Sequence, residues 1–137
     1  RWVKGKTPPE LWDALGPANE LLPTGQALAI WRAHGLDMAL TSQESAGLAV
    51  HASRSQDGRR VTVFLLRKSR EPARVTVQRP DQMTERVRVW RWSGDGSEDV
   101  SPKYTMLESR RMHNGRMELE LPPVSLTVAE MEGTRTR

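Results

Sequence analysis

Cysteine is absent from this chain of 137 residues. Disulfide bonds, thiolate zinc sites and a cysteine nucleophile are therefore excluded, while bacterial cytoplasm and secretion are both compatible with the sequence. Long apolar runs are also missing, because no segment approaches the roughly 20 residues that a bilayer span requires. No charged and then apolar signal segment opens the chain. We therefore expect neither a membrane span nor a membrane partner.

Hydrophobic residues are few, at 36% of the chain, and aromatic residues make up only 5%. The hydrophobic share is below the usual value for globular domains, so the core must be narrow. The length suits one compact domain and leaves no room for a second domain with its own core. These proportions favour a thin, layered fold.

The charge is basic, with 21 lysines and arginines against 17 acidic residues and a formal net charge of +4. Many arginines fall at expected strand positions, which is compatible with a binder of nucleic acid or of an anionic polysaccharide. Acidic residues are interspersed, and the sequence has no block of like charge. We do not expect nucleic acid as a partner, and a polyanion binder stays as a third hypothesis.

Residues 1–35 have the pattern of helix and loop. Thr7-Pro8-Pro9-Glu10 has the spacing of a capping box, and Thr24 can cap a second helix from Gly25 to His34. Gly35 is placed to end that helix. Several side chains of this lead are too apolar for a solvated arm. We expect the following residues to form an interface with the rest of the chain, a partner or a second copy: Trp12, Leu28, Ile30 and Trp31.

From Leu36 onward the apolar period changes from 3.6 to 2, which is typical of half-buried strands. Gln56-Asp57-Gly58 and Asn114-Gly115 supply hairpin turns. The expected strands lie near residues 36–41, 48–53, 60–66, 73–77, 87–92, 107–112, 117–121 and 125–131. The side chains expected between two sheets are Val63, Leu65, Leu119, Leu121, Leu126 and Val128. The spacing predicts a mainly β fold, an antiparallel sandwich of about eight strands over residues 36–132, with a polar tail at 133–137.

No catalytic or metal-binding template fits the sequence. Gly-x-Ser-x-Gly, a phosphate-binding glycine loop and paired histidines are all absent, and His34, His51 and His113 are far apart in sequence. The oxygen-rich segment from Asp95 to Asp99 lacks the distal glutamate of a calcium loop and is better interpreted as a solvated turn. We therefore expect no catalytic residue, no metal site and no cofactor in this chain.

Two tryptophans offer the one candidate ligand site. Trp90 and Trp92 share a strand face with Arg88, and such a face could stack on a sugar ring or a base. The opposite face carries Val87, Val89 and Arg91. One of the two faces must be core, and tryptophans are often buried. A binding platform and a core role therefore both stay open.

Three segments carry a family resemblance: Leu22 to Trp31, Asp57 to Ser69 and Leu119 to Val128. They resemble the C-terminal part of clan A glycoside hydrolases such as α-L-arabinofuranosidases, β-xylosidases and iduronidase-like or heparanase-like enzymes. In that clan a catalytic (β/α)8 barrel is followed by a β-sandwich. Arg67 stands where the family's strand commonly has asparagine.

The resemblance implies an accessory role. Residues 1–35 would correspond to the end of a catalytic barrel, and the sandwich would pack on and stabilise a barrel that this chain lacks. That barrel would belong to the same parent protein or to a partner chain. Asn19-Glu20 resembles the acid/base dipeptide of these enzymes, but no apolar strand precedes it, so we interpret it as a chance match. The alternative is an independent carbohydrate-binding module whose partner is a polysaccharide.

Overall fold

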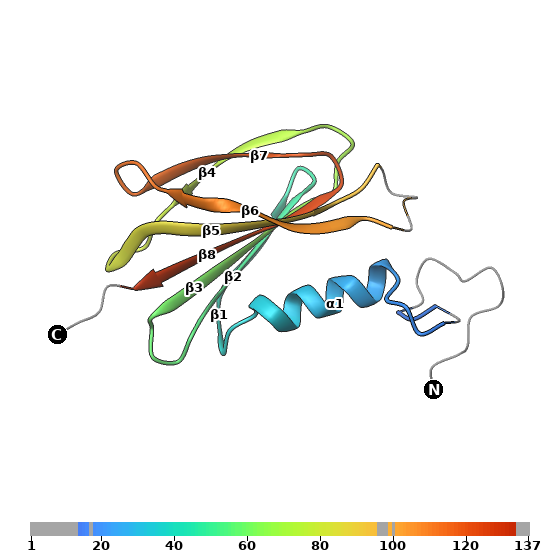
Figure 1. Cartoon of the computed structure of the whole chain (residues 1–137). Coiled ribbons are helices and arrows are strands. Elements are labelled where there is room, and N and C mark those ends of the chain that lie inside the picture. The colour runs from blue at the N-terminus through green and yellow to red at the C-terminus, as the bar shows by residue number, and fades with distance from the viewer. Residues whose placement is uncertain (1–13, 17, 96–98, 100, 134–137) are drawn as a thin grey trace.

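The protein forms three layers in a computed structural model that describes residues 14–16, 18–95, 99 and 101–133 (Figure 1). Within these residues, one helix covers one face of a six-stranded sheet, and a two-stranded sheet covers the other. The capping box at residues 7–10, Trp12 and the tail residues 134–137 lie outside the described part of the chain.

Helix α1 spans Pro23–His34. It begins earlier than predicted, because Leu22 and not Thr24 occupies the N-cap position and proline stands in the first turn. The fixed φ of proline suits that turn, where its missing N–H costs nothing. The Gly35 N–H closes the helix by donating to the Trp31 carbonyl at 2.7 Å. No helix in the described ranges is long and apolar enough to cross a membrane.

Eight strands follow in the described residues, which confirms the predicted number and the mainly β class. Every strand pair is antiparallel. The large sheet has the order β1-β2-β3-β8-β5-β6, and the small sheet pairs β4 with β7. The strands are β1 (Met38–Ser45), β2 (Leu48–Arg54), β3 (Arg60–Arg67), β4 (Ala73–Gln78), β5 (Met83–Ser93), β6 (Lys103–Arg111), β7 (Arg116–Leu121) and β8 (Ser125–Gly133).

Both predicted turns are present, but only the turn at Gln56-Asp57-Gly58 joins two paired strands as a hairpin. Asn114 and Gly115 have φ angles of 52° and 72°, as a tight turn between twisted strands requires. In the other turn Gly58 has a φ of 73°, and the Ser55 N–H donates to the Arg60 carbonyl at 3.0 Å. The Gly58 turn sets the register of the β2–β3 pair, whereas Asn114-Gly115 leads the chain from β6 in the large sheet to β7 in the small sheet.

The core between the two sheets is built from alternate residues of the facing strands. Leu65, Leu119 and Leu121 are buried there as predicted, and Val63 packs against them while remaining half-buried. The buried members of this inner core are Val61, Leu65, Val77, Met83, Val87, Val89, Met112, Met117, Leu119, Leu121 and Met131.

Leu126 and Val128 are buried, but their predicted place between the sheets is wrong. They belong to a second cluster with Phe64 and Ile30, beneath helix α1. Strand β8 lies at the centre of the large sheet, where helix α1 covers one of its faces and the small sheet covers the other, so its apolar run does not reveal which face is which. The alternate residue Ala129 faces the inner side.

Candidate functional site

Trp90, Trp92 and Arg88 lie together on the outer face of the large sheet, next to helix α1. Both tryptophans are half-buried and pack against the cluster under the helix. The Trp92 Nε1–H donates to the Gln26 Oε1 atom of the helix at 3.0 Å. The Arg88 guanidinium carbon lies 5.9 Å from the centre of the Trp90 ring. The structure therefore brings the three predicted residues together and places the helix against them.

A buried histidine joins the helix to this face. His34 lies at the end of α1, and its ring centre is 4.5 Å from that of Trp90. Its Nδ1 atom is 2.5 Å from Glu130 Oε1 on β8, and its Nε2 atom is hydrogen-bonded to the Tyr104 hydroxyl on β6. A carboxylate only accepts, so in neutral His34 the Nδ1–H donates to Glu130 and Nε2 accepts from Tyr104.

This His34–Glu130–Tyr104 network continues to a surface ion pair. Arg88 Nη2 is 3.5 Å from Glu130 Oε2 and 2.8 Å from Glu132 Oε1. Burial, together with the nearby Glu130 carboxylate, raises the pKa of Tyr104 to about 12. Sequence reasoning missed the network, because its members lie on three different elements. A glutamate inside the apolar strand β8 was the available signal.

The predicted interface residues divide into covered and exposed groups. Ile30 is 3% exposed and packs under the helix, and Trp31 stacks on Phe64 with ring centres 3.9 Å apart. The outer edge of Trp31 stays open, with 41% of the residue exposed. Leu28 points away from the sheet and is 57% exposed, while Trp12 lies outside the described residues.

A mostly apolar groove of about 460 Å³ runs between helix α1 and the start of β6. Its lining residues are Leu21, Gln26, Ala29, Ile30, Ala33, Pro102 and Tyr104. Met106 and Leu107 of β6 are exposed as well. Helix α1 and β6 thus present an apolar surface, which we call the helix-side surface.

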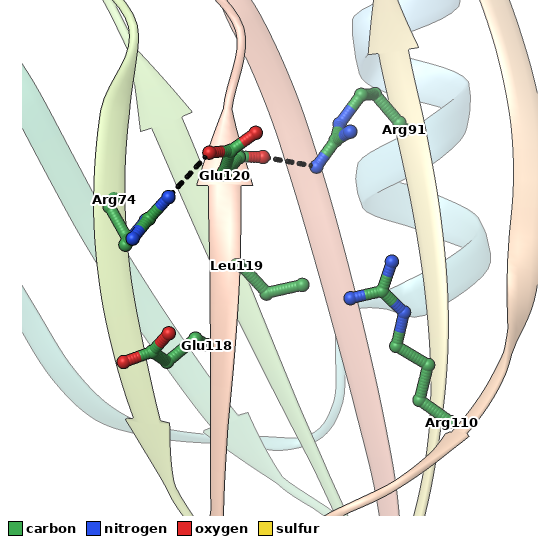
Figure 2. Close-up of a pocket in the computed structure, with 6 residues that line it drawn as sticks. All are labelled: Arg74, Arg91, Arg110, Glu118, Leu119 and Glu120. Atoms are coloured by element: carbon green, nitrogen blue, oxygen red, sulfur yellow. Dashed lines mark hydrogen bonds and ion pairs between the residues drawn. The ribbon is translucent and has the colours of Figure 1, made fainter.

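A polar pocket of about 380 Å³ lies on the opposite side of the molecule, beside β7 (Figure 2). Figure 2 shows Arg91 of β5 and Arg110 of β6 pointing into the space beside β7, where Leu119 also points. Arg74 of β4 reaches Glu120 from the other side. We call this the arginine pocket, and it is lined by Arg74, Arg91, Arg110, Glu118, Leu119 and Glu120. Sequence reasoning did not predict it.

Hydrogen bonds hold Arg91 and Arg74 in place. Arg91 Nη2 donates to the Glu120 carbonyl at 2.7 Å and Nε to Thr127 Oγ1 at 3.3 Å, which bridges the two sheets. Burial, and then the positive charge of Arg110, lowers the pKa of Arg91. Arg74 Nη2 donates to Glu120 Oε1 at 2.8 Å, and this bond holds the pKa of Glu120 below its usual value.

The other candidate residues have local roles. In the described ranges, no three His, Asp or Glu side chains gather as a metal site. His51 is half-buried and hydrogen-bonded to Ser42 at 2.7 Å, and His113 is exposed. Asp99 accepts from the Asp95 and Ser101 amides at 3.0 and 2.8 Å, as in a turn, while residues 96–98 lie outside the described part.

The Asn19-Glu20 pair lies in an exposed turn before the helix. Asn19 has a φ of 62°, and Glu20 Oε2 accepts from the Ala18 amide at 2.9 Å. The turn is closed where the Gly16 N–H donates to the Glu20 carbonyl at 2.9 Å. The Glu20 carboxylate therefore stabilises its own turn.

No protein-family model matches the chain, and no curated protein matches its sequence. Solved structures do resemble it. A bifunctional glucanase-xylanase, CelM2, from a metagenome library has a TM-score of 0.67 and 16% identity over 82% of this chain. The MgGH51 α-L-arabinofuranosidase has a TM-score of 0.66 and 11% identity over 83% of this chain. A family 44 xyloglucanase from Paenibacillus polymyxa has a TM-score of 0.65 and 14% identity over 80% of this chain.

This chain covers only 22%, 20% and 22% of those three proteins, respectively. At such low identity the likeness concerns the fold. The resemblance that the sequence suggested is confirmed at that level: helix and sandwich together reproduce about a fifth of several glycoside hydrolase chains.

Proposed function

We propose that this chain is the accessory C-terminal β-sandwich domain or subunit of a glycoside hydrolase, and that it packs on a (β/α)8 catalytic barrel outside this sequence. One observation carries the proposal. The chain matches 20–22% of the length of structurally similar enzymes that act on glucans, xylans, xyloglucan and arabinofuranosides by their names. The remaining four-fifths of such enzymes leave room for a barrel-sized domain.

The helix-side surface supplies the proposed contact with the barrel. Leu28 of the helix and Met106 of β6 are 57% and 56% exposed, and Tyr104 lines the groove between the helix and β6. Contiguous apolar surface of this kind is typical of an interface, because its removal from water stabilises the association. The partner that fits is a similarly apolar surface of a neighbouring domain.

The two tryptophans support the same proposal. Trp92 is hydrogen-bonded to Gln26 of the helix, and Trp90 contacts the His34 ring. Their side chains therefore help to fix α1 on the sheet. Sugar binding on Trp90, Trp92 and Arg88 stays the alternative. It requires that the contacts with the helix leave a face of a tryptophan ring accessible to the sugar.

A reconstitution experiment tests the proposal. The barrel encoded in the parent gene or by a partner is produced separately and mixed with this chain, and the affinity is measured by calorimetry. Leu28→Glu or Met106→Glu should weaken association at least about 10-fold, because each places a charge in an apolar contact. Thr76→Glu, on the exposed side of the small sheet, is the matched control and should leave the affinity unchanged. Equal binding by all variants would overturn the proposed surface.

Turnover by the isolated chain is a separate test. We expect no hydrolysis of aryl arabinosides, xylosides or glucuronides, since the catalytic carboxylates of such enzymes lie at barrel strands. Activity that disappears in Glu20→Gln would contradict the accessory role and make Asn19-Glu20 a true acid/base site.

The carbohydrate-binding and polyanion alternatives separate on one salt titration. Stacking on tryptophan responds weakly to salt, whereas arginine-led binding of a polyanion weakens steeply. Micromolar, salt-insensitive binding of xylan-type or arabinan-type oligosaccharides, abolished by Trp92→Ala and kept by Arg74→Ala, would favour the carbohydrate-binding module. Tight, salt-sensitive heparin binding would favour the polyanion binder.

A further inference from the structure

We propose that the arginine pocket binds a small hydroxylated carboxylate, such as a sugar acid. The pocket lies across the sandwich from helix α1, so the proposal does not rest on the accessory role or on the helix-side surface. Its residues come from four strands of both sheets: β4, β5, β6 and β7.

The guanidinium of Arg91 is held in place before any ligand arrives. Its bonds to the Glu120 carbonyl and to Thr127 use the Nη2 and Nε atoms, and the stem is half-buried between the sheets. A guanidinium has five N–H donors, so donors beyond these two bonds remain for a ligand. An anchored arginine loses little side-chain entropy when it binds a carboxylate.

A second arginine faces the same space. Arg110 points from β6 toward Arg91, with Leu119 beside both (Figure 2). Burial is the main cause of the lowered pKa of Arg91, and repulsion from the positive charge of Arg110 adds to it. An anion between the two guanidinium groups would offset this repulsion, and a planar carboxylate fits their forked donors.

The charge and the acceptors of the pocket narrow the ligand class. Three arginines and two glutamates line it, which gives a net charge of +1. One negative charge on the ligand balances this, whereas a phosphate dianion would meet the carboxylates of Glu118 and Glu120 with excess charge. Those carboxylates accept hydrogen bonds, so hydroxyl groups on the ligand would supply matching donors.

The size of the pocket favours one small molecule. Its volume of about 380 Å³ is near the lower end of ordinary ligand sites, and Leu119 supplies an apolar wall for C–H groups. A single hydroxylated ring or short chain that bears one carboxylate combines these features. Sugar acids and hydroxy acids share this chemistry.

The test is a titration of the full 137-residue chain. The probes are sodium D-glucuronate, sodium lactate, neutral D-glucose and inorganic phosphate, followed by calorimetry and by amide chemical shifts. We expect glucuronate to bind and to shift amides of β5, β6 and β7, while glucose does not bind. Raising the salt concentration should weaken glucuronate binding. If lactate binds as tightly as glucuronate, the result would support a hydroxylated carboxylate as the ligand and would indicate a short hydroxy acid.

Variants complete the test. Arg110→Gln should weaken glucuronate binding at least about 10-fold, the loss expected for a charged hydrogen bond. Arg86→Gln removes the same charge from an exposed position outside the pocket and should leave binding unchanged. Arg91→Gln should act like Arg110→Gln, but it also removes a bridge between the sheets, so Arg110→Gln decides if Arg91→Gln does not fold. Equal binding of glucose, tighter binding of phosphate, or unchanged binding by Arg110→Gln would each overturn the proposal.

Discussion

The two faces of the large sheet are covered in different ways. The inner face is closed by the small sheet, and its contacts are apolar side chains such as Val87, Val89 and Leu121, which are fully buried. The outer face is covered by one helix, and polar contacts from Gln26 and His34 accompany the apolar ones. Helix α1 is too narrow to cover the face, so β6 keeps exposed apolar residues.

This difference indicates which face of the sheet is closed by the chain itself. The inner core buries its apolar residues within the chain, and such a core stabilises the fold on its own. The outer face buries its apolar side chains only in part, because Trp31, Leu28 and Met106 remain exposed. We infer that the inner face carries most of the stability of the isolated chain, while the outer face leaves apolar side chains exposed to water.

The largest loss of stability is expected from a substitution in the core on the inner face. Leu65→Ala deletes a side chain that is buried between the sheets and should cost about 2–5 kcal/mol of unfolding free energy. Leu40→Ala, in exposed strand β1, is the control and should change the unfolding free energy by less than about 0.5 kcal/mol. Urea unfolding followed by circular dichroism measures both. A loss below about 0.5 kcal/mol for Leu65→Ala would mean that β3 is not a central strand.

A smaller effect is expected beneath the helix. Ile30→Ala removes the buried contact of α1 with Phe64 and should cost about 2 kcal/mol, the low end for such deletions, because a surface helix can settle into the gap. Amide hydrogen exchange should become faster in α1 and stay unchanged in β3. Leu28→Ala, on the exposed side of the same helix, is the matched control. Faster exchange throughout the chain would contradict two separately stabilised faces.

The polar contacts of the helix should contribute less to the unfolding free energy than its apolar contacts do. His34→Gln cannot keep both the Glu130 and the Tyr104 bonds, so we expect a loss of about 1–2 kcal/mol. His113→Gln changes an exposed histidine and should be neutral. Denaturant unfolding followed by circular dichroism gives the stability of each variant. Unchanged stability in His34→Gln would show that the His34–Glu130–Tyr104 network does not hold the helix.

Much of the fold could be predicted from the sequence because its signals are local. Alternating apolar residues mark β7, where Met117, Leu119 and Leu121 face the core, and Asn114-Gly115 marks the turn before it. For β8 the sequence could not predict which residues face the small sheet and which face the helix. Its residues are buried on both faces, so periodicity carries no information about which neighbour each one meets.

The sites were harder to predict, because they join distant segments. Trp90 and Trp92 were visible as neighbours on one strand face, yet their contact with the helix depends on how α1 crosses the sheet. His34 and Glu130 are 96 residues apart, and the arginine pocket combines four strands from two sheets. No spacing rule connects such residues, since only the packing of the layers brings them together.

The smallest expected effect concerns the hydroxyl of Tyr104, the single tyrosine of the chain. Its pKa is about 12 in the folded protein against an ordinary value of 10.0. The folded chain therefore holds this proton more tightly, and the resulting stability is present below pH 10 and lost as the pH rises toward 12. Tyr104→Phe should remove this part of the alkaline loss of stability, and at pH 7 it should cost less than His34→Gln because only the bond to His34 is lost. Thr105→Ser on the same strand should keep the alkaline loss. Absorbance at about 295 nm follows the titration without interference from other tyrosines, and a midpoint near 10 would show that α1 does not shield the hydroxyl from water.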